Sequence, residues 1–363
     1  MGGFECSTHR RADGKRLDLL TTTRHAEFAA ADYARLRSHG IRVAREGIRW
    51  HLIERRRGRY DFSSVLPLLD AARAARVQVV WDLFHYGWPD DIDIFSPEFV
   101  RCYAGLARAF ADFVGQESEK PLIVAPVNEI SYVAWAAGTV GRIYPCEKER
   151  GPELKRQLVR AAIAGIEAVW EAAPTARIVH PDPVINVIAD PARPEDESGA
   201  AAYRRGQYES WDMLCGQLAP ELGGAPKYLD IIGVNYYPAN QWFLDGATIL
   251  RGRAEYRPFR EILAEVYARY GRPIIIAETS DEGASGPAWL RYVCGETKAA
   301  MRAGVEIEGI CIYPVLDYPG WDDDRLCSTG LWGYAVDDGR REIKRPLAWE
   351  LRRQRRAFVV RSA

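Results

Sequence analysis

Two glutamates stand directly after apolar, β-branched runs, a position that suits catalysis. Glu129 follows Val-Ala-Pro-Val-Asn and Glu278 follows Pro-Ile-Ile-Ile-Ala. A carboxylate at the lip of a core strand costs desolvation free energy unless it is paired or used. A structural ion pair would explain one such residue, but two suit cleavage of a glycosidic bond. In that reaction one carboxyl protonates the leaving oxygen, and the other attacks the anomeric carbon or activates water.

Strands that alternate with helices must position this pair. Apolar, β-rich runs occupy residues 17–23, 41–50, 77–85, 122–129, 176–183, 229–237, 273–279 and 307–317. Helical periodicity occupies residues 66–75, 100–114, 154–173 and 258–270. Alternation implies a parallel sheet, and eight units favour a closed (β/α)8 barrel. The runner-up, a doubly wound dinucleotide fold, lacks its GxGxxG and GxxxxGK[ST] motifs here.

Length and composition suit one catalytic domain over residues 1–363, with residues 1–16 as a loose N-terminal segment. The chain is 47% hydrophobic, which is enough for a large core. Its formal net charge of −1 gives no reason to expect nucleic acid or an anionic membrane as a partner. The N-terminus has no signal-peptide pattern, no run approaches a membrane span, and the cysteines are scattered. We therefore expect a cytoplasmic protein with reduced thiols.

Polar residues gather where the expected strands end, as a catalytic barrel requires. Besides the two glutamates they are Arg45, Arg49, His85, Asn128, His180, Asp182, Asn235, Tyr237 and Asp317. Strands four and seven, which carry the glutamates, lie across a narrow barrel mouth from each other. No HxH or HExxH spacing occurs, so we expect no metal and no cofactor. No lysine ends a strand, which disfavours an aldolase.

Several motifs resemble the family 1 β-glucosidases of glycoside hydrolase clan A. Residues 44–53, 81–89, 126–130, 233–238, 275–279 and 330–353 are similar, in order, to that family's signatures on strands two, three, four, six and seven and to its C-terminal ending. The resemblance implies a retaining β-glycosidase acting on a carbohydrate, with Glu129 as acid/base and Glu278 as nucleophile. It also places Arg45 on the family's active-site arginine and His85 on its sugar-binding histidine.

The expected strands one and eight depart from that family. The chain reads Tyr-Pro-Val-Leu-Asp-Tyr-Pro-Gly-Trp at 313–321. Tyr313 stands where the family has a platform tryptophan, Gly320 where it has a sugar-clamping glutamate, and Trp321 is retained. The family's strand-one glutamine has no counterpart in residues 21–25. Either the substrate is a deoxy, amino or otherwise modified sugar, or the clamp comes from elsewhere, such as Asp317 or residues 322–324.

The two glutamates should differ in charge, because neighbouring carboxylates cannot both ionise cheaply. Arg45 and the Tyr237 phenol would hold the charge on Glu278, so Glu129 should start protonated. Asn235 and Tyr237 share one face of their strand, and Asn128 could hold a sugar 2-hydroxyl. His180 and Asp182 suit either a subsite or a turn.

Other functions remain open for the same residues. A clan A transglycosylase, or an endo-glycosidase on a modified-sugar oligosaccharide, would use the same two glutamates. A noncatalytic sugar-binding relative would keep the pocket and lose a carboxylate, and the retention of both disfavours it.

Overall fold

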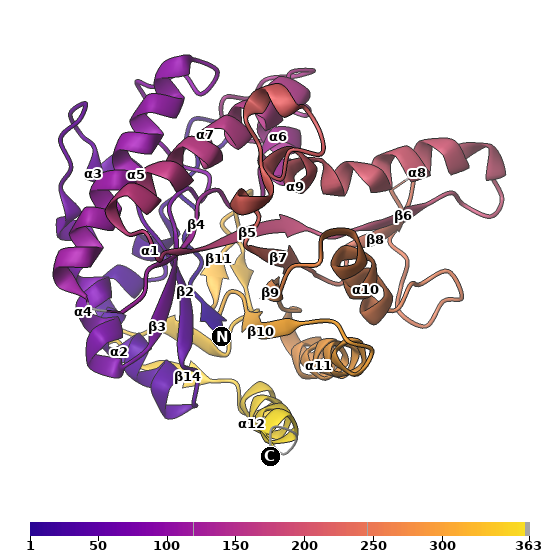
Figure 1. The fold of residues 1–363 in the computed structure, drawn as a ribbon. Coiled ribbons are helices and arrows are strands. Elements are labelled where there is room, and N and C mark those ends of the chain that lie inside the picture. Colours follow the sequence, from indigo (N-terminus) through magenta and orange to yellow (C-terminus); the bar gives the residue numbers. More distant parts are fainter. Residues whose placement is uncertain (119, 245, 360–363) are drawn as a thin grey trace.

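Eight parallel strands close into a barrel in the order β1-β10-β9-β7-β5-β4-β3-β2. The computed structural model describes residues 1–118, 120–244 and 246–359. The barrel strands are β1 (Gly2–Gly3), β2 (Val43–Gly47), β3 (Gln78–Asp82), β4 (Ile123–Ala125), β5 (Arg177–Pro183), β7 (Ile231–Asn235), β9 (Ile274–Thr279) and β10 (Ile307–Ile312). Helices surround the strands (Figure 1). The expected (β/α)8 class is confirmed.

Most of the helices pack their apolar faces against the outside of the barrel. They are α1 (Leu19–Thr22), α2 (His25–Ser38), α3 (Trp50–Ile53), α4 (Leu66–Ala75), α5 (Pro97–Glu117), α6 (Ile130–Gly138), α7 (Gly151–Ala172), α8 (Glu197–Arg205), α9 (Glu209–Leu214), α10 (Phe259–Tyr270), α11 (Gly286–Arg302) and α12 (Arg345–Val359). The four helices expected from periodicity correspond to α4, α5, α7 and α10. In α5, for example, Phe99, Tyr103, Leu106 and Phe110 are buried at helical spacing.

The first strand lies elsewhere than expected, and the N-terminal segment is not loose. Residues 17–23 contain helix α1, which begins where the Asp18 side chain accepts a hydrogen bond from the Thr21 N–H. The barrel is instead closed by Gly2–Gly3, which pairs with β10 on one side and β2 on the other. A Cβ atom on Gly3 would lie 2.2 Å from the Tyr313 ring, so only glycine allows this packing. Two glycines carry no hydrophobic pattern, which is why both expectations were wrong.

The inside and the outside of the barrel are filled separately. Val80, Val179, Ile231, Ile275 and Ala277 form the small cluster inside, whereas the larger cluster lies between strands and helices. Successive side chains on a strand point to opposite faces. This alternation decides which polar residues at the strand ends can reach the barrel mouth.

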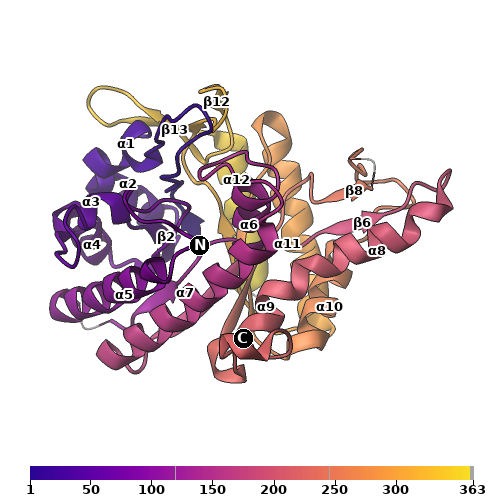
Figure 2. The same cartoon turned by 90° about the horizontal axis from the view of Figure 1, so that it is seen from above.

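A small arm projects from one side of the barrel in both views (Figures 1 and 2). It consists of α8 and the parallel strands β6 (Asn186–Ile188) and β8 (Gln241–Phe243). Two antiparallel pairs follow the last barrel strand: β11 (Tyr318–Pro319) with β12 (Leu326–Cys327), and β13 (Trp332–Ala335) with β14 (Arg341–Ile343). Among the described residues, no helix combines the length and apolar character needed to cross a membrane.

Candidate active site

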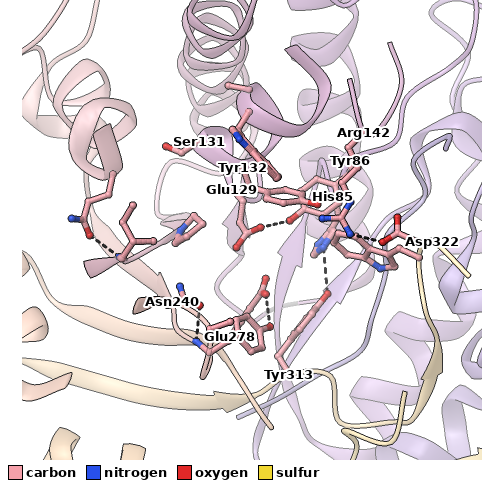
Figure 3. Close-up of a pocket in the computed structure, with 18 of the residues that line it drawn as sticks. His85, Tyr86, Glu129, Ser131, Tyr132, Arg142, Asn240, Glu278, Tyr313 and Asp322 are labelled. Atoms are coloured by element: carbon pink, nitrogen blue, oxygen red, sulfur yellow. Dashed lines mark hydrogen bonds and ion pairs between the residues drawn. The ribbon is translucent and has the colours of Figure 1, made fainter. Parts of the chain in front are cut away.

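A pocket of about 1010 Å³ opens at the C-terminal ends of the barrel strands. Glu129 and Glu278 both line it and approach it from different walls (Figure 3). Four other residues expected at the site also line it: His85, Tyr237, Tyr313 and Trp321. The barrel therefore brings these six residues together at one cavity, although they are spread over most of the chain.

Glu278, next to last in strand β9, lies among groups that suit a carboxylate anion. Arg45 Nη1 donates to Glu278 Oε1 at 2.6 Å, and the Tyr237 hydroxyl donates to Oε2 at 2.7 Å. Arg45 is almost fully buried and also donates from Nε to Asp82 Oδ1 at 3.0 Å. Burial acts to raise the pKa of Asp82, but Arg45 and His85 together outweigh it and the pKa is lowered. The expected support of Glu278 by Arg45 and Tyr237 is present.

Glu129 follows strand β4 among neutral groups. Its Oε1 accepts from Asn235 Nδ2 at 2.9 Å, and its Oε2 accepts from the Tyr86 hydroxyl at 2.5 Å. Burial, and next the charge of Glu278, raise the pKa of Glu129 to about 8. At neutral pH the group is therefore mainly the protonated acid.

The backbone of Glu129 adopts a conformation that few side chains tolerate. Its φ of +50° lies in the left-handed region, directly before helix α6. Such a residue costs on the order of 1–3 kcal/mol and persists where its surroundings hold it. The Glu129 N–H donates to the Pro181 carbonyl at 2.9 Å, which anchors the turn to strand β5. In this conformation the Glu129 side chain lines the pocket.

Asn128 links the supports of the two glutamates. Its Oδ1 accepts from Arg45 Nη2 at 2.5 Å, and its Nδ2 lies 2.8 Å from the Tyr86 hydroxyl and 3.3 Å from His85 Nε2. Asn128 is fully buried and does not line the pocket. The amide of Asn128 is therefore not free to make the contact with a sugar 2-hydroxyl that was expected. Asn128 instead orients Arg45 and Tyr86, which contact the two glutamates.

His85 and Tyr313 form one wall of the pocket. His85 Nδ1 lies 2.9 Å from Asp82 Oδ2, and the Tyr313 hydroxyl lies 3.4 Å from His85 Nε2 (Figure 3). The two rings are nearly parallel, at 9°. The Arg45 guanidinium lies 5.1 Å from the centre of the Tyr313 ring. Tyr313 thus supplies both an aromatic face and a hydroxyl.

One group of possible metal ligands lies beneath this wall. Ligand atoms of Cys6, Asp82 and His85 all lie within 4.8 Å of one another. However, Arg45 Nη2 lies 2.8 Å from Asp82 Oδ2. A divalent cation would meet that fixed guanidinium charge, so this donor set fits a metal poorly.

Four residues expected at strand ends, Arg49, His180, Asp182 and Asp317, neither line the pocket nor contact the two glutamates. Arg49 instead donates to the Thr21 hydroxyl. His180 Nε2 pairs with the Tyr228 carbonyl at 2.7 Å, and Asp182 accepts from Ser131 N–H at the start of α6. Asp317 accepts from Lys344 Nζ at 2.6 Å. On β5, residues 180 and 182 point to the helices because Val179 points inward. The expected roles of His180, Asp182 and Asp317 as subsite or clamp residues are corrected accordingly.

Several pocket residues were missed in the sequence. Glu5 is the most important, because it follows the true first strand and stands 5% exposed in the pocket wall. Its position at the end of a strand was not recognised, because the first strand was expected at residues 17–23. Tyr86, next to His85, also lines the pocket and has a φ of +70°. At the rim, Arg142 pairs with Asp322, one of the acidic residues considered as a clamp (Figure 3).

Comparison with known proteins gives a likeness of fold. No family model matches the chain, and no curated protein matches its sequence. The family 1 β-glucosidase of Thermotoga maritima is similar at TM-score 0.74 and 15% identity, over 91% of this chain and 86% of that one. The AHE enzyme from Alicyclobacillus herbarius is similar at TM-score 0.76 and 17% identity, over 92% and 87%. The resemblance to family 1 β-glucosidases is thus confirmed at the level of the fold.

Proposed function

We propose that this protein is a retaining β-glycosidase in which Glu129 is the acid/base and Glu278 the nucleophile. The observation that carries the proposal is the asymmetry between two carboxyls at one cavity. Glu278 contacts a buried cation and a phenol, whereas Glu129 contacts only neutral groups. An acid and an anion in the same site are what double displacement requires at one pH.

The steps follow from these protonation states. A Glu278 oxygen forms a bond to the anomeric carbon while Glu129 gives its proton to the departing glycosidic oxygen. Glu129, now a carboxylate, takes a proton from water as the water oxygen attacks the same carbon. The bond to Glu278 breaks and its carboxylate is restored. Tyr86 and Asn235 can stabilise the charge on Glu129 between the two steps, because both donate to it.

The pocket supports a carbohydrate substrate. The T. maritima β-glucosidase has been solved with glucoimidazole and with noeuromycin, and its fold covers most of this chain. Here Tyr313 and Trp321 offer aromatic faces beside the two glutamates. Further out, the rings of Trp135, Tyr203 and Trp242 also line the cavity. The apolar faces of sugars suit such surfaces.

Azide rescue tests the two roles. Glu129→Ala and Glu278→Ala should each lose activity on aryl β-glycosides, by about 10²–10⁴-fold for the acid/base. Azide should restore Glu129→Ala with a β-glycosyl azide and Glu278→Ala with an α-glycosyl azide. Asp112→Asn, on the exposed face of α5 and outside the pocket, serves as the control and should keep full activity. The same anomer from both glutamate variants would overturn the roles.

Covalent labelling tests the nucleophile directly. A 2-fluoroglycoside probe followed by peptide mapping should modify Glu278. Modification of any other residue would overturn the mechanism, and an inverted anomer in the first product seen by NMR would overturn retention.

A longer substrate is the second candidate. The pocket volume of about 1010 Å³ lies at the upper end of the roughly 300–1,000 Å³ that is common for small-ligand sites. The outer rings of Trp135 and Trp242 could hold further sugar units, as endo-action or transglycosylation requires. Chromatography of products from a defined oligosaccharide separates these activities: release of single terminal sugars favours exo-action, and internal cleavage favours endo-action.

A further inference from the structure

Four carboxyl groups surround the inner pocket, but they face one buried cation among the described residues. Arg45 is that cation, and Asp82 and Glu278 share it. Glu129 forms no ion pair with a cation. It needs none, because its raised pKa keeps the carboxyl group neutral. The fourth carboxyl belongs to Glu5, and the mechanism proposed above does not use it.

Glu5 is held rigidly on one side only. Its Oε1 accepts from the Ser7 N–H at 3.0 Å and from the Ser7 hydroxyl at 2.5 Å. Among the described residues, no donor contacts Oε2, and no lysine or arginine forms an ion pair with Glu5. The side chain is 5% exposed, and that exposure is to the pocket. Burial raises the pKa of Glu5, because charge without a partner is costly in a protein interior. A cationic ligand would favour the carboxylate form and pair with it.

The nearby His85 acts to lower the pKa of Glu5, but burial outweighs it, and the imidazole makes its hydrogen bonds to other groups. His85 Nδ1 lies 2.9 Å from Asp82, and Asn128 Nδ2 lies 3.3 Å from His85 Nε2. The two ring nitrogens of His85 thus face Asp82 and Asn128. Neither nitrogen donates to Glu5. Tyr132, Tyr313 and Tyr318 also interact with Glu5, and their phenols carry no positive charge.

We propose that Glu5 binds a protonated amino group of the sugar, so that the substrate is a β-glycoside of an amino sugar. The inference rests on the proposed function, because it assigns the sugar that occupies the same pocket. An ammonium group would donate to Oε2 and balance the negative charge of the Glu5 carboxylate. A hydroxyl could donate to Oε2 as well, but it would leave that charge in place. Charge-assisted hydrogen bonds are about twice as strong as neutral ones.

Substrate preference and one isosteric variant test the proposal. The substrates are 4-nitrophenyl β-glucoside and its 2-, 3-, 4- and 6-amino-deoxy analogues, assayed below the pKa of the amines. For the wild type we expect kcat/KM to be about tenfold or more higher for at least one amino sugar than for the glucoside. In Glu5→Gln that preference should disappear, because kcat/KM should fall by a larger factor for the amino sugar than for the glucoside. Asp112→Asn removes the same charge from the exposed face of α5, outside the pocket, and should keep the preference.

Two outcomes would overturn the proposal. One is a wild type that prefers the neutral glucoside to every amino analogue. The other is Glu5→Gln lowering kcat/KM equally for neutral and amino substrates, which would make Glu5 a hydroxyl clamp. Should Glu5→Gln fail to fold, Ser7→Ala removes one of the two hydrogen bonds that orient the carboxylate. It should lower the amino preference in part, and an unchanged preference would count against the proposal.

Calorimetry separates this inference from the proposed function. If the wild type cleaves no glycoside in the panel, the proposed function fails. Binding of free glucosamine and its 3-, 4- and 6-amino isomers, compared with glucose, still tests Glu5. Tighter binding of an amino sugar that is lost in Glu5→Gln supports the inference, and equal affinities refute it.

Discussion

The pKa of Glu129 should depend on the charge of Glu278, and Glu278→Gln tests that dependence without changing the shape of the side chain. A pKa of about 8 instead of 4.5 corresponds to roughly 5 kcal/mol of preference for the neutral acid, at about 1.4 kcal/mol for each pH unit. Burial is the larger cause and remains in the variant. A like charge across a site with an effective dielectric constant near 20 contributes roughly 2–3 kcal/mol. The pKa of Glu129 should therefore fall from about 8 to about 6, and it should remain above 4.5.

Tyr86→Phe should shift the same pKa in the opposite direction. The Tyr86 hydroxyl donates to Glu129 Oε2 and favours the charged form. Phenylalanine keeps the ring and removes the donor, so the pKa of Glu129 should rise. This variant retains both glutamates. The alkaline fall of its kcat/KM, where Glu129 loses its proton, should therefore move to higher pH than in the wild type.

Carbon-13 NMR of protein labelled at the glutamate δ-carbon measures these pKa values directly. The Glu129 resonance is assigned by its absence from Glu129→Gln. The reasoning is refuted if Glu278→Gln leaves the pKa of Glu129 unchanged or raises it. It is equally refuted if Tyr86→Phe lowers that pKa.

Three further predictions concern the framework of the site. Arg45→Met leaves two buried carboxylates without their cation, so the free energy of unfolding in urea should fall by about 3–5 kcal/mol; an unchanged midpoint would contradict the pairing. Gly3→Ala places a methyl group against the Tyr313 ring and should cost about 1–3 kcal/mol and perturb activity, whereas neutral behaviour in both assays would contradict the position of β1. Burial disfavours a charge on His25, but Glu46 and a second carboxylate outweigh it and raise its pKa to about 9. Because the folded pKa is raised, this stability is complete below about pH 6.5 and is lost as pH rises through about 9; His25→Gln should abolish that part of the pH dependence in urea titrations.

The sequence was sufficient for the elements that carry their own pattern. Apolar runs before Glu129 and Glu278 predicted two strands, and helical periodicity predicted α4, α5, α7 and α10. Parallel strands end at one rim, so the pairing of these glutamates at a single cavity also followed from order along the chain. These features depend on the periodicity of side chains along the chain, which can be recognised without knowledge of the fold.

Tertiary structure decided what local pattern cannot express. Gly2–Gly3 is a strand only because β2 and β10 present backbone groups on both sides of it. The orientation of Asp182 depends on which face of β5 meets the barrel interior. The position of Glu5 was likewise decided by tertiary structure. Glu5 lines the pocket only because the preceding strand, β1, closes the barrel. The sequence by itself determined the strands that carry the two glutamates. The closure of the barrel determined which other side chains surround them, because that depends on contacts between residues far apart in the chain.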